Sequence, residues 1–374
     1  MQLHERLRYA RTRAKLNGTQ VASRTGIGKS SLSEFETGKR EPSLSQLHAL
    51  AKAYRRSVPF FLSADPIPTE VVLWREEPSG GSSDVEARFL RLCEQYHNLE
   101  VWADEQVGGC LPEVVCDAEA FSYADARKLA KDVRDKLQLG DRPALSLLAV
   151  LEEIGGVKVF HLPFEPTGTA ASTLGETFGP AVLLNSTNRR WRRNFDLAHE
   201  LFHLLTWHVF RTEAGHAASP AVAGGKEESL ADCFASNLLV PLEPLRAAID
   251  PCLVKERKLT FQALFDIARQ FDVSVAALLW GIHYAYRTRD DVDRTLADIA
   301  KAKEKEPGPL LEERGDTPPP EWPDRYRALA IKVLRRGEMS LGRFAEYLGI
   351  SRRDAARYNE QEITDDEEVQ VSPA

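Results

Sequence analysis

The chain has 374 residues, a formal net charge of −7 and five cysteines, with 43% hydrophobic and 28% charged residues. This length can hold two or three domains, and the composition is that of an ordinary globular protein. An odd cysteine count without a C-x-x-C pair argues against a disulfide framework and a cysteine-rich zinc module. The first residues are typical of a charged helix rather than a signal peptide, and no apolar run approaches the roughly eighteen residues that span a bilayer. We therefore expect a cytoplasmic protein without a membrane partner.

Five short helices are predicted within residues 1–64, which are locally basic although the whole chain is acidic. The second helix begins at a capping box, Asn17 with Gln20 three residues later, and stops near Gly26. The third covers Lys29 to Thr37, and two shorter helices follow. Two helices joined by a tight glycine turn inside a small bundle are typical of a helix-turn-helix domain.

This segment resembles the XRE/phage-repressor-like family over almost all of residues 3–62. In that family the third helix lies in the major groove of double-stranded DNA. The matching outward positions are Gly28, Lys29, Ser30, Ser31 and Ser33. Lys39 and Arg40 would lie near phosphates, where they position the protein without reading sequence, and Arg11 and Glu36 match an internal ion pair. Gly18 stands where many members have a phosphate-contacting Gln. The alternative is a domain that dimerises or binds peptide without touching DNA.

A breaker-rich linker is predicted at residues 65–84, with a short extended piece at 71–75. Helices are expected after Asp84, at 118–137 and at 143–154. Three candidate strands follow, at 157–162, 168–174 and 180–184. An edge strand of such a sheet can pair with an extended substrate peptide. His161, in the first strand, is interpreted as structural rather than as a metal ligand.

The next predicted helix carries the motif His199-Glu200-Leu201-Phe202-His203. The two histidines lie four residues apart, so a helix places both imidazoles on one face, one turn from each other. Two imidazoles placed this way can share a Zn²⁺, and Glu200 beside them can act as a general base toward a water. The alternative is a pair of helix histidines that are satisfied by the core or by solvent.

A catalytic zinc usually takes three protein ligands, so the third is sought downstream. Glu228 and Asp232 share one face of a further predicted helix, one turn apart. Glu228 as ligand and Asp232 as acceptor for the free N–H of a ligand histidine form a coherent pair. Three rivals stay open: Glu227, which faces about 100° away on the helix, and His208 and His216, which lie in a polar segment.

Residues 140–285 resemble ImmA/IrrE-type metallopeptidases. The resemblance is carried by Asn185, by the run 193–203, and by residues 228–241, which meet the pattern E-x-x-A-[ND]-x-F-A at every fixed position. Phe202 departs from the family pattern, because Gly often precedes the second histidine.

The resemblance implies a Zn²⁺ held by His199, His203 and Glu228, with Glu200 as general base. Mn²⁺ is the alternative metal, since it also occupies sites of two histidines and one carboxylate. A second electrophile can stabilise the oxyanion. The candidates for that role are Tyr284, Tyr286, His283 and Arg192.

The expected fold is α+β and mainly α, with a five-helix bundle, a zincin-like domain with a small sheet, and a helical tail. Residues 339–353 have helix-turn-helix rhythm with Gly349 at the turn, which leaves open a second DNA or partner contact or a plain packing element. The expected divisions are a DNA-binding domain at 1–64, a linker at 65–84, a metallopeptidase domain at 85–290, a flexible linker at 301–324, and a C-terminal helical unit with an acidic disordered tail at 325–374.

These features predict a regulatory zinc endopeptidase of the HExxH type with its own DNA-binding domain. The resemblance implies that such an enzyme cuts a helix-turn-helix repressor to switch on a stress, mobile-element or phage-defence response. Single-stranded DNA as activator and a homodimer are compatible with it. The alternatives are a transcriptional regulator whose peptidase-like domain senses metal or peptide without cutting, and an antitoxin-like autoregulator. The intact Glu200 argues against a pure sensor.

Overall fold

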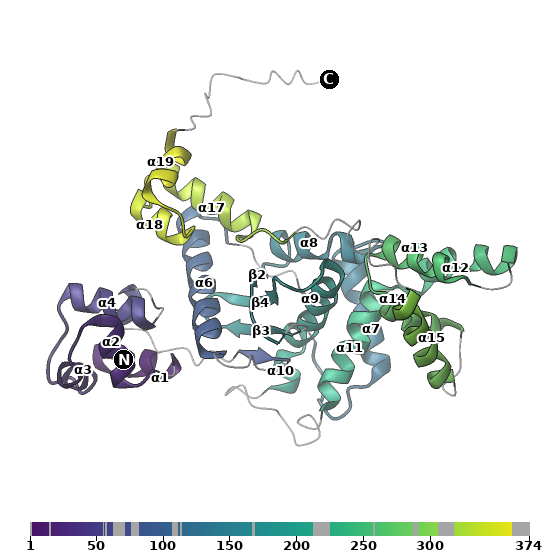
Figure 1. The fold of residues 1–374 in the computed structure, drawn as a ribbon, viewed down its shortest axis with the longest axis horizontal. Helices are drawn as coiled ribbons and strands as arrows, with labels where there is room; N and C mark the ends of the chain where they lie inside the picture. The colour runs from purple at the N-terminus through teal and green to yellow at the C-terminus, as the bar shows by residue number, and fades with distance from the viewer. Residues whose placement is uncertain are drawn as a thin grey trace.

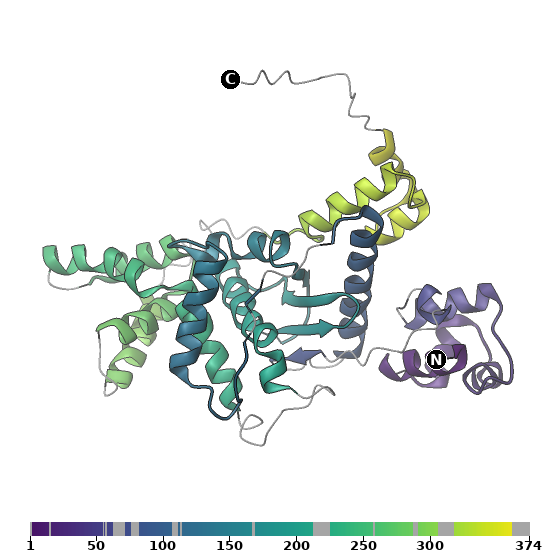
Figure 2. The same ribbon diagram turned by 180° about the vertical axis from the view of Figure 1, so that it is seen from behind.

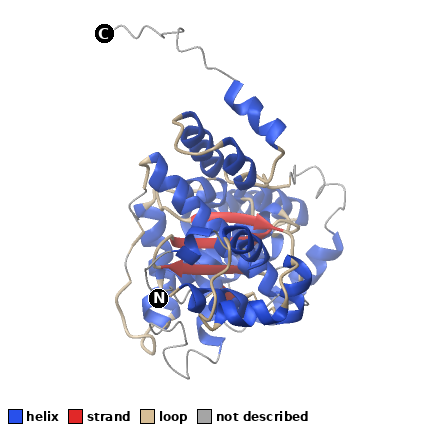
Figure 3. Ribbon diagram, turned by 90° about the vertical axis from the view of Figure 1, so that its left-hand side faces the viewer, coloured by secondary structure: helices blue, strands red, loops and turns tan. Residues whose placement is uncertain are grey.

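The computed structural model describes residues 2–14, 16–54, 56, 58–62, 72–75, 82–106, 111–112, 114–166, 169–211, 225–256, 259–286, 291–305 and 318–360. Over these ranges the chain is mainly helical, with one small sheet near the centre (Figures 1 and 3). The prediction of a mainly α, α+β fold is confirmed. Among the described helices, none has the length and apolar character that crossing a membrane requires.

The N-terminal bundle consists of α1 (Leu3–Arg13), α2 (Gly18–Thr25), α3 (Lys29–Glu36), α4 (Leu44–Tyr54) and α5 (Val58–Leu62). The predicted capping box is present, because the Asn17 side chain accepts a hydrogen bond from Gln20 N while the Gln20 side chain accepts one from Asn17 N. Gly26 ends α2 in the left-handed conformation, with φ of 72°. The bundle has a core of its own, made by Leu7, Ala10, Val21, Leu32, Phe35, Leu47, Leu50 and Phe61 among others.

The central sheet has the strand order β1-β3-β4-β2. Its strands are β1 (Leu73–Trp74), β2 (Lys158–Leu162), β3 (Ala170–Gly175) and β4 (Gly179–Asn185). β3 and β4 form an antiparallel hairpin, and β2 runs parallel to β4. The short piece before α6 (Ser82–Ala103) is a fourth strand, since β1 pairs antiparallel with β3. The edge of β3 at Ala171 and Ser172 is therefore occupied by the chain itself.

Both faces of the sheet are covered by helices, because alternate side chains of each strand point to opposite sides. On one face, Val159, Val182 and Leu184 join the core around α9 (Arg190–Leu205). On the other face, Phe160 and Leu183 join the core around α6. The histidine-bearing helix α9 is thus fixed against the sheet on one side.

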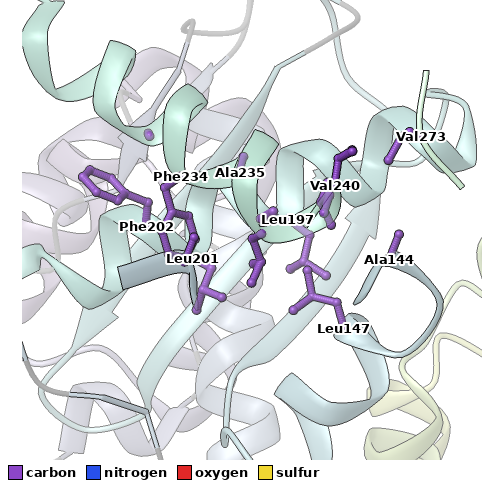
Figure 4. Close-up of a cluster of buried hydrophobic side chains, with 14 of the residues drawn as sticks. Ala144, Leu147, Leu197, Leu201, Phe202, Phe234, Ala235, Val240 and Val273 are labelled. Atoms are coloured by element: carbon purple, nitrogen blue, oxygen red, sulfur yellow. The ribbon is translucent and has the colours of Figure 1, made fainter. Parts of the chain in front are cut away.

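The remaining helices of the central part are α7 (Tyr123–Lys136), η1 (Pro143–Leu145), α8 (Leu147–Glu153), α10 (Trp207–Phe210), α11 (Glu227–Leu239), α12 (Leu242–Glu256), α13 (Phe261–Phe271), α14 (Val275–Tyr286) and α15 (Val292–Lys305). Of these, η1, α8, α10 and α11 contact α9. Figure 4 shows Leu201 and Phe202 of α9 against Phe234 of α11. α15 continues to residue 305, so the start of the predicted linker at 301–324 is helical.

The C-terminal unit comprises α17 (Asp324–Arg335), α18 (Leu341–Tyr347) and α19 (Arg352–Glu360). It packs on α6, away from α12 to α15 (Figures 1 and 2). Tyr326 of α17 meets Tyr96 of α6 edge to face, with ring centroids 5.4 Å apart, and Arg325 pairs with the buried Glu100 at 2.6 Å. The predicted acidic tail lies outside the described residues.

Candidate metal centre and substrate cleft

Two imidazole nitrogens of α9 face a common point. His199 and His203 are buried, and their Nε2 atoms are 3.2 Å apart. The helix itself produces this arrangement, because residues four apart lie on one face and the apolar residues between them are held in the core. The sequence prediction that both rings share a face is met in the structure.

α11 brings a carboxylate to the same point. Glu228 Oε2 lies 3.1 Å from His199 Nε2, and Glu228 Oε1 lies 3.5 Å from His203 Nε2. One donor atom from each of these three residues falls within 4.8 Å of the others. Two imidazoles and one carboxylate are a zinc ligand set, so the residues fit a metal ion. The Glu228 side chain is 45% exposed, which leaves one side of the group open.

The outer nitrogens of both histidines are held by carboxylates. His199 Nδ1 donates to Asp232 Oδ1 at 2.9 Å, and His203 Nδ1 donates to Glu227 Oε1 at 2.7 Å. Such partners fix the ring orientation and direct the Nε2 lone pair toward a metal. Glu227 also pairs with Arg211. It therefore contacts the Nδ1 side of His203. The group that faces the common point consists of His199, His203 and Glu228, which we call the triad.

Of the two rival histidines, His208 is exposed on α10 and is not part of this group. His216 lies outside the described residues. His161 on β2 is not part of the group, and burial with the nearby Arg193 lowers its pKa to about 4. These positions agree with the interpretation of His161 as structural.

The electrostatics of the centre favour a positive charge. Burial lowers the pKa of His199, but hydrogen bonds to Asp232 and Glu228 outweigh it and raise that pKa to about 9. A site whose carboxylates stabilise a charged imidazolium also stabilises a bound cation at the same place.

Glu200 lies beside the triad with one oxygen engaged and one free. Ser172 of β3 donates its hydroxyl hydrogen to Glu200 Oε2 at 2.6 Å. The other oxygen, Oε1, is buried and has no hydrogen-bond partner among the described residues. A buried carboxylate oxygen without a partner is costly in a purely structural role. It is available to a water or a substrate proton.

Arg75, next to β1, reaches the metal centre from the N-terminal part of the chain. Its Nη2 pairs with Asp232 Oδ1 at 3.0 Å, and its Nη1 lies 3.6 Å from Asp196 Oδ1. Arg192 pairs with the same Asp196 at 2.9 Å. Sequence reasoning missed Arg75 and Ser172, because both reach the site through strand pairing across the chain.

A cleft of about 500 Å³ opens beside the metal centre. Ser229 and Asp232 of α11, which both follow Glu228 in sequence, line this cleft. Its remaining walls are mostly aromatic or small and include Phe195, Tyr123, Trp280, Tyr284, Ala277 and Ser236. A partly apolar concave surface of this size is suited to bind a side chain or another small group.

The four candidates for stabilising the oxyanion lie in different places in the structure. Arg192 and Tyr284 line the cleft. His283 is buried and hydrogen-bonded to Thr295 at 3.0 Å, and Tyr286 donates its hydroxyl hydrogen to Asp250 at 2.6 Å. Arg192 and Tyr284 therefore remain as candidates near the reacting groups.

The predicted DNA-contacting residues lie on the surface of the N-terminal bundle. Lys29, Ser30, Ser33, Lys39 and Arg40 are exposed, as is the backbone around Gly28, while Ser31 is half-buried. Arg11 and Glu36 form the expected internal ion pair, with nitrogen–oxygen distances of 2.6 and 2.8 Å. This pair ties α1 to the end of α3.

The bundle and the candidate metal centre together define a helix-turn-helix protein with a metallopeptidase-like domain. Residues 2–59 match a helix-turn-helix domain family, and residues 152–282 match the IrrE N-terminal-like domain, a peptidase family. The chain thus joins these two domains, which confirms the predicted fusion. No curated protein matches the chain. Residues 283–374 lie beyond both matches.

Proposed function

We propose that this chain is a metal-dependent endopeptidase with its own DNA-binding domain. The observation that carries the proposal is the buried, unpartnered Oε1 of Glu200 next to the convergent His199, His203 and Glu228. A metal-binding sensor needs the three ligands but has no use for the free carboxylate oxygen. A hydrolase needs both.

His199, His203 and Glu228 would hold the ion, with Zn²⁺ favoured and Mn²⁺ as the alternative. When bound, the ion would lower the pKa of a water and polarise the scissile carbonyl. Asp232 and Glu227 keep the two rings in the ligating orientation.

Glu200 carries the proton transfers in this proposal. Its Oε1 takes a proton from the attacking water and later returns it to the leaving amine. Ser172 holds the other oxygen, so the carboxylate presents a fixed edge to the water. Arg192 and Tyr284 are placed in the cleft to receive the developing negative charge on the carbonyl oxygen.

The proposed substrate is a helix-turn-helix repressor, which is cut to release a stress, mobile-element or phage-defence response. Support comes from the fused helix-turn-helix domain and from the family resemblance. That domain would contact double-stranded DNA through α3, with Lys29 and Ser30 toward the bases and Lys39 and Arg40 toward phosphates. It could thereby keep the enzyme near the promoter that the repressor controls.

The test is cleavage of a proteome-derived peptide library by Zn²⁺-loaded protein, with new amino termini identified by mass spectrometry. Wild type should cut, whereas Glu200→Gln should lose at least about 100-fold in rate and keep its bound metal. Glu243→Gln, a matched change at an exposed position of α12, should cut like wild type. No cleavage by metal-loaded wild type, together with intact promoter binding, would favour the sensor alternative instead.

A further inference from the structure

The C-terminal unit repeats the geometry of the N-terminal helix-turn-helix. In α2 and α3 the turn is Gly26-Ile27-Gly28, and in α18 and α19 it is Gly349-Ile350-Ser351. Gly26 and Gly349 both take the left-handed conformation, with φ of 72° and 63°. Both first helices begin with a side-chain cap, since Asn17 accepts from Gln20 N and Ser340 accepts from Arg343 N.

The correspondence extends to the core at a constant offset of 323 positions. At this offset three buried positions of the first motif correspond to three buried positions of the second: Leu16 to Met339, Val21 to Phe344, and Leu32 to Ala355. Phe35 corresponds to Tyr358, which packs on Phe344 at a ring distance of 5.4 Å. α18 and α19 therefore pack as a helix-turn-helix pair, with α19 in the position of α3.

The outward face of α19 is more basic than that of α3. Lys29 and Ser30 correspond to Arg352 and Arg353, which are both exposed, and Glu34 corresponds to the exposed Arg357. Asp354 is the acidic residue of the first turn, and it is hydrogen-bonded to Ser351 at 2.7 Å. The opposite face packs toward α17 and α18 through Ala355 and Tyr358. Arginines on the outer face of a second motif helix match the charge of a DNA backbone.

We propose that residues 324–360 are a second DNA-contacting helix-turn-helix, which binds double-stranded DNA through Arg352, Arg353 and Arg357 of α19. This unit lies beyond both family matches, and the inference does not depend on peptidase activity. In Figures 1 and 2 the two helix-turn-helix units lie on the same side of the molecule as α6, away from α12 to α15. One chain could then contact a duplex at two places.

The test uses the full chain and a fluorescent 30-base-pair duplex of random sequence, with binding measured by anisotropy across a salt series. Each phosphate contact contributes about 0.9 to the slope of log K against log salt, so R352A/R353A/R357A should lower that slope by up to ~2.7 and weaken binding about tenfold or more at low salt. The matched control R294A/K301A/K303A removes three exposed charges from α15 and should bind like wild type.

Two further variants separate this proposal from its alternatives. K29A/K39A/R40A in the N-terminal domain should leave residual DNA binding, which the α19 changes then remove. R352K/R353K/R357K keeps the charge and should restore most of the slope. An unchanged slope in the α19 alanine variant, complete loss of binding in the N-terminal variant, or equal loss in the lysine and alanine variants would each overturn the proposal.

Discussion

Both ring nitrogens of His199 and of His203 have a partner in the structure. One nitrogen faces the shared point, and the other donates to a carboxylate that belongs to α11. Because Asp232 and Glu227 come from the same helix as Glu228, one element supplies both the third ligand and the two orienting groups. The position of α11 against α9 therefore sets the whole centre.

Weakening either orienting carboxylate should weaken metal binding without removing a ligand. We expect Asp232→Asn and Glu227→Gln each to lower Zn²⁺ affinity by about 10–100-fold, because the amide keeps a hydrogen bond but loses the charge that raises ligand basicity. Competition with a fluorescent chelator measures this change. Asp293→Asn on the exposed start of α15 is the control, and an affinity like wild type in both site variants would argue that the two carboxylates are only structural.

At the scale of single residues, the sequence predicts those site residues that share one helix at a regular spacing. Helical spacing brought His199 to His203 and Glu228 to Asp232. From the sequence Glu227 is predicted only as a rival ligand, because its contact with His203 Nδ1 depends on how α11 crosses α9. Ser172 and Arg75 depend on the register of β3 and β1. Spacing along one element is local, whereas crossing and register are set by tertiary packing.

The packing of α9 depends on one large side chain, that of Phe202. Phe202 is fully buried and its ring packs within 6.0 Å, centroid to centroid, of those of Phe121, Phe210 and Phe234. The family often has Gly here, and in this chain the aromatic ring fills the space between α9 and α11.

Phe202→Ala should therefore destabilise the chain by about 3–5 kcal/mol, which is typical of deleting a fully buried aromatic ring. Urea unfolding followed by circular dichroism measures this loss. Leu44→Ala, at a side chain that is 74% exposed, should change stability by less than about 0.5 kcal/mol. Equal stability of the two variants would mean that the Phe202 ring does not stabilise the packing of α9 against α11.

The sheet order limits where an extended peptide could pair with the sheet. β1 covers β3 at Ala171 and Ser172, so the edge strands of the sheet are β1 and β2. The pairing was not predictable, since β1 has two residues and its partner follows about a hundred positions later. A substrate that extends the sheet would have to use another stretch of edge or displace β1.

At the scale of the whole molecule, the C-terminal unit is packed against the sheet-bearing part. Glu152 of α8 is buried, and burial raises its pKa to about 8, with repulsion from Glu153 and Asp324 adding to the effect and Arg325 opposing it. Asp324 and Arg325 belong to α17. The protonation of Glu152 therefore reports on the contact between these two parts of the chain.

The pKa of the Glu152 carboxyl is about 8 in the folded chain and about 4.3 in the unfolded chain. The stability that this difference contributes is therefore fully present below a pH of about 4.3 and is lost as the pH rises through about 8. Wild type should lose melting temperature between pH 5 and 9 more steeply than Glu152→Gln. We expect the variant to gain about 1 kcal/mol, or roughly 2–4 °C, relative to wild type at pH 9. Glu243→Gln at an exposed position of α12 is the control, and parallel pH profiles for all three proteins would contradict this account.

Helices and caps of the N-terminal bundle could be predicted, because capping residues and glycine turns act over a few positions. The three separate cores could not, since they combine segments from distant parts of the chain. α6 and α17, for example, share one core although about 220 residues separate them. Long-range packing of this kind leaves little local signal.

The most direct measurement of the central claim is bound metal per chain, determined by mass spectrometry of elements after zinc loading and removal of excess. We expect about one Zn²⁺ per chain in wild type and in Glu200→Gln, and little in Glu228→Gln. Full occupancy in Glu228→Gln would move the third ligand elsewhere. No metal in wild type after loading would contradict a metal-dependent peptidase altogether.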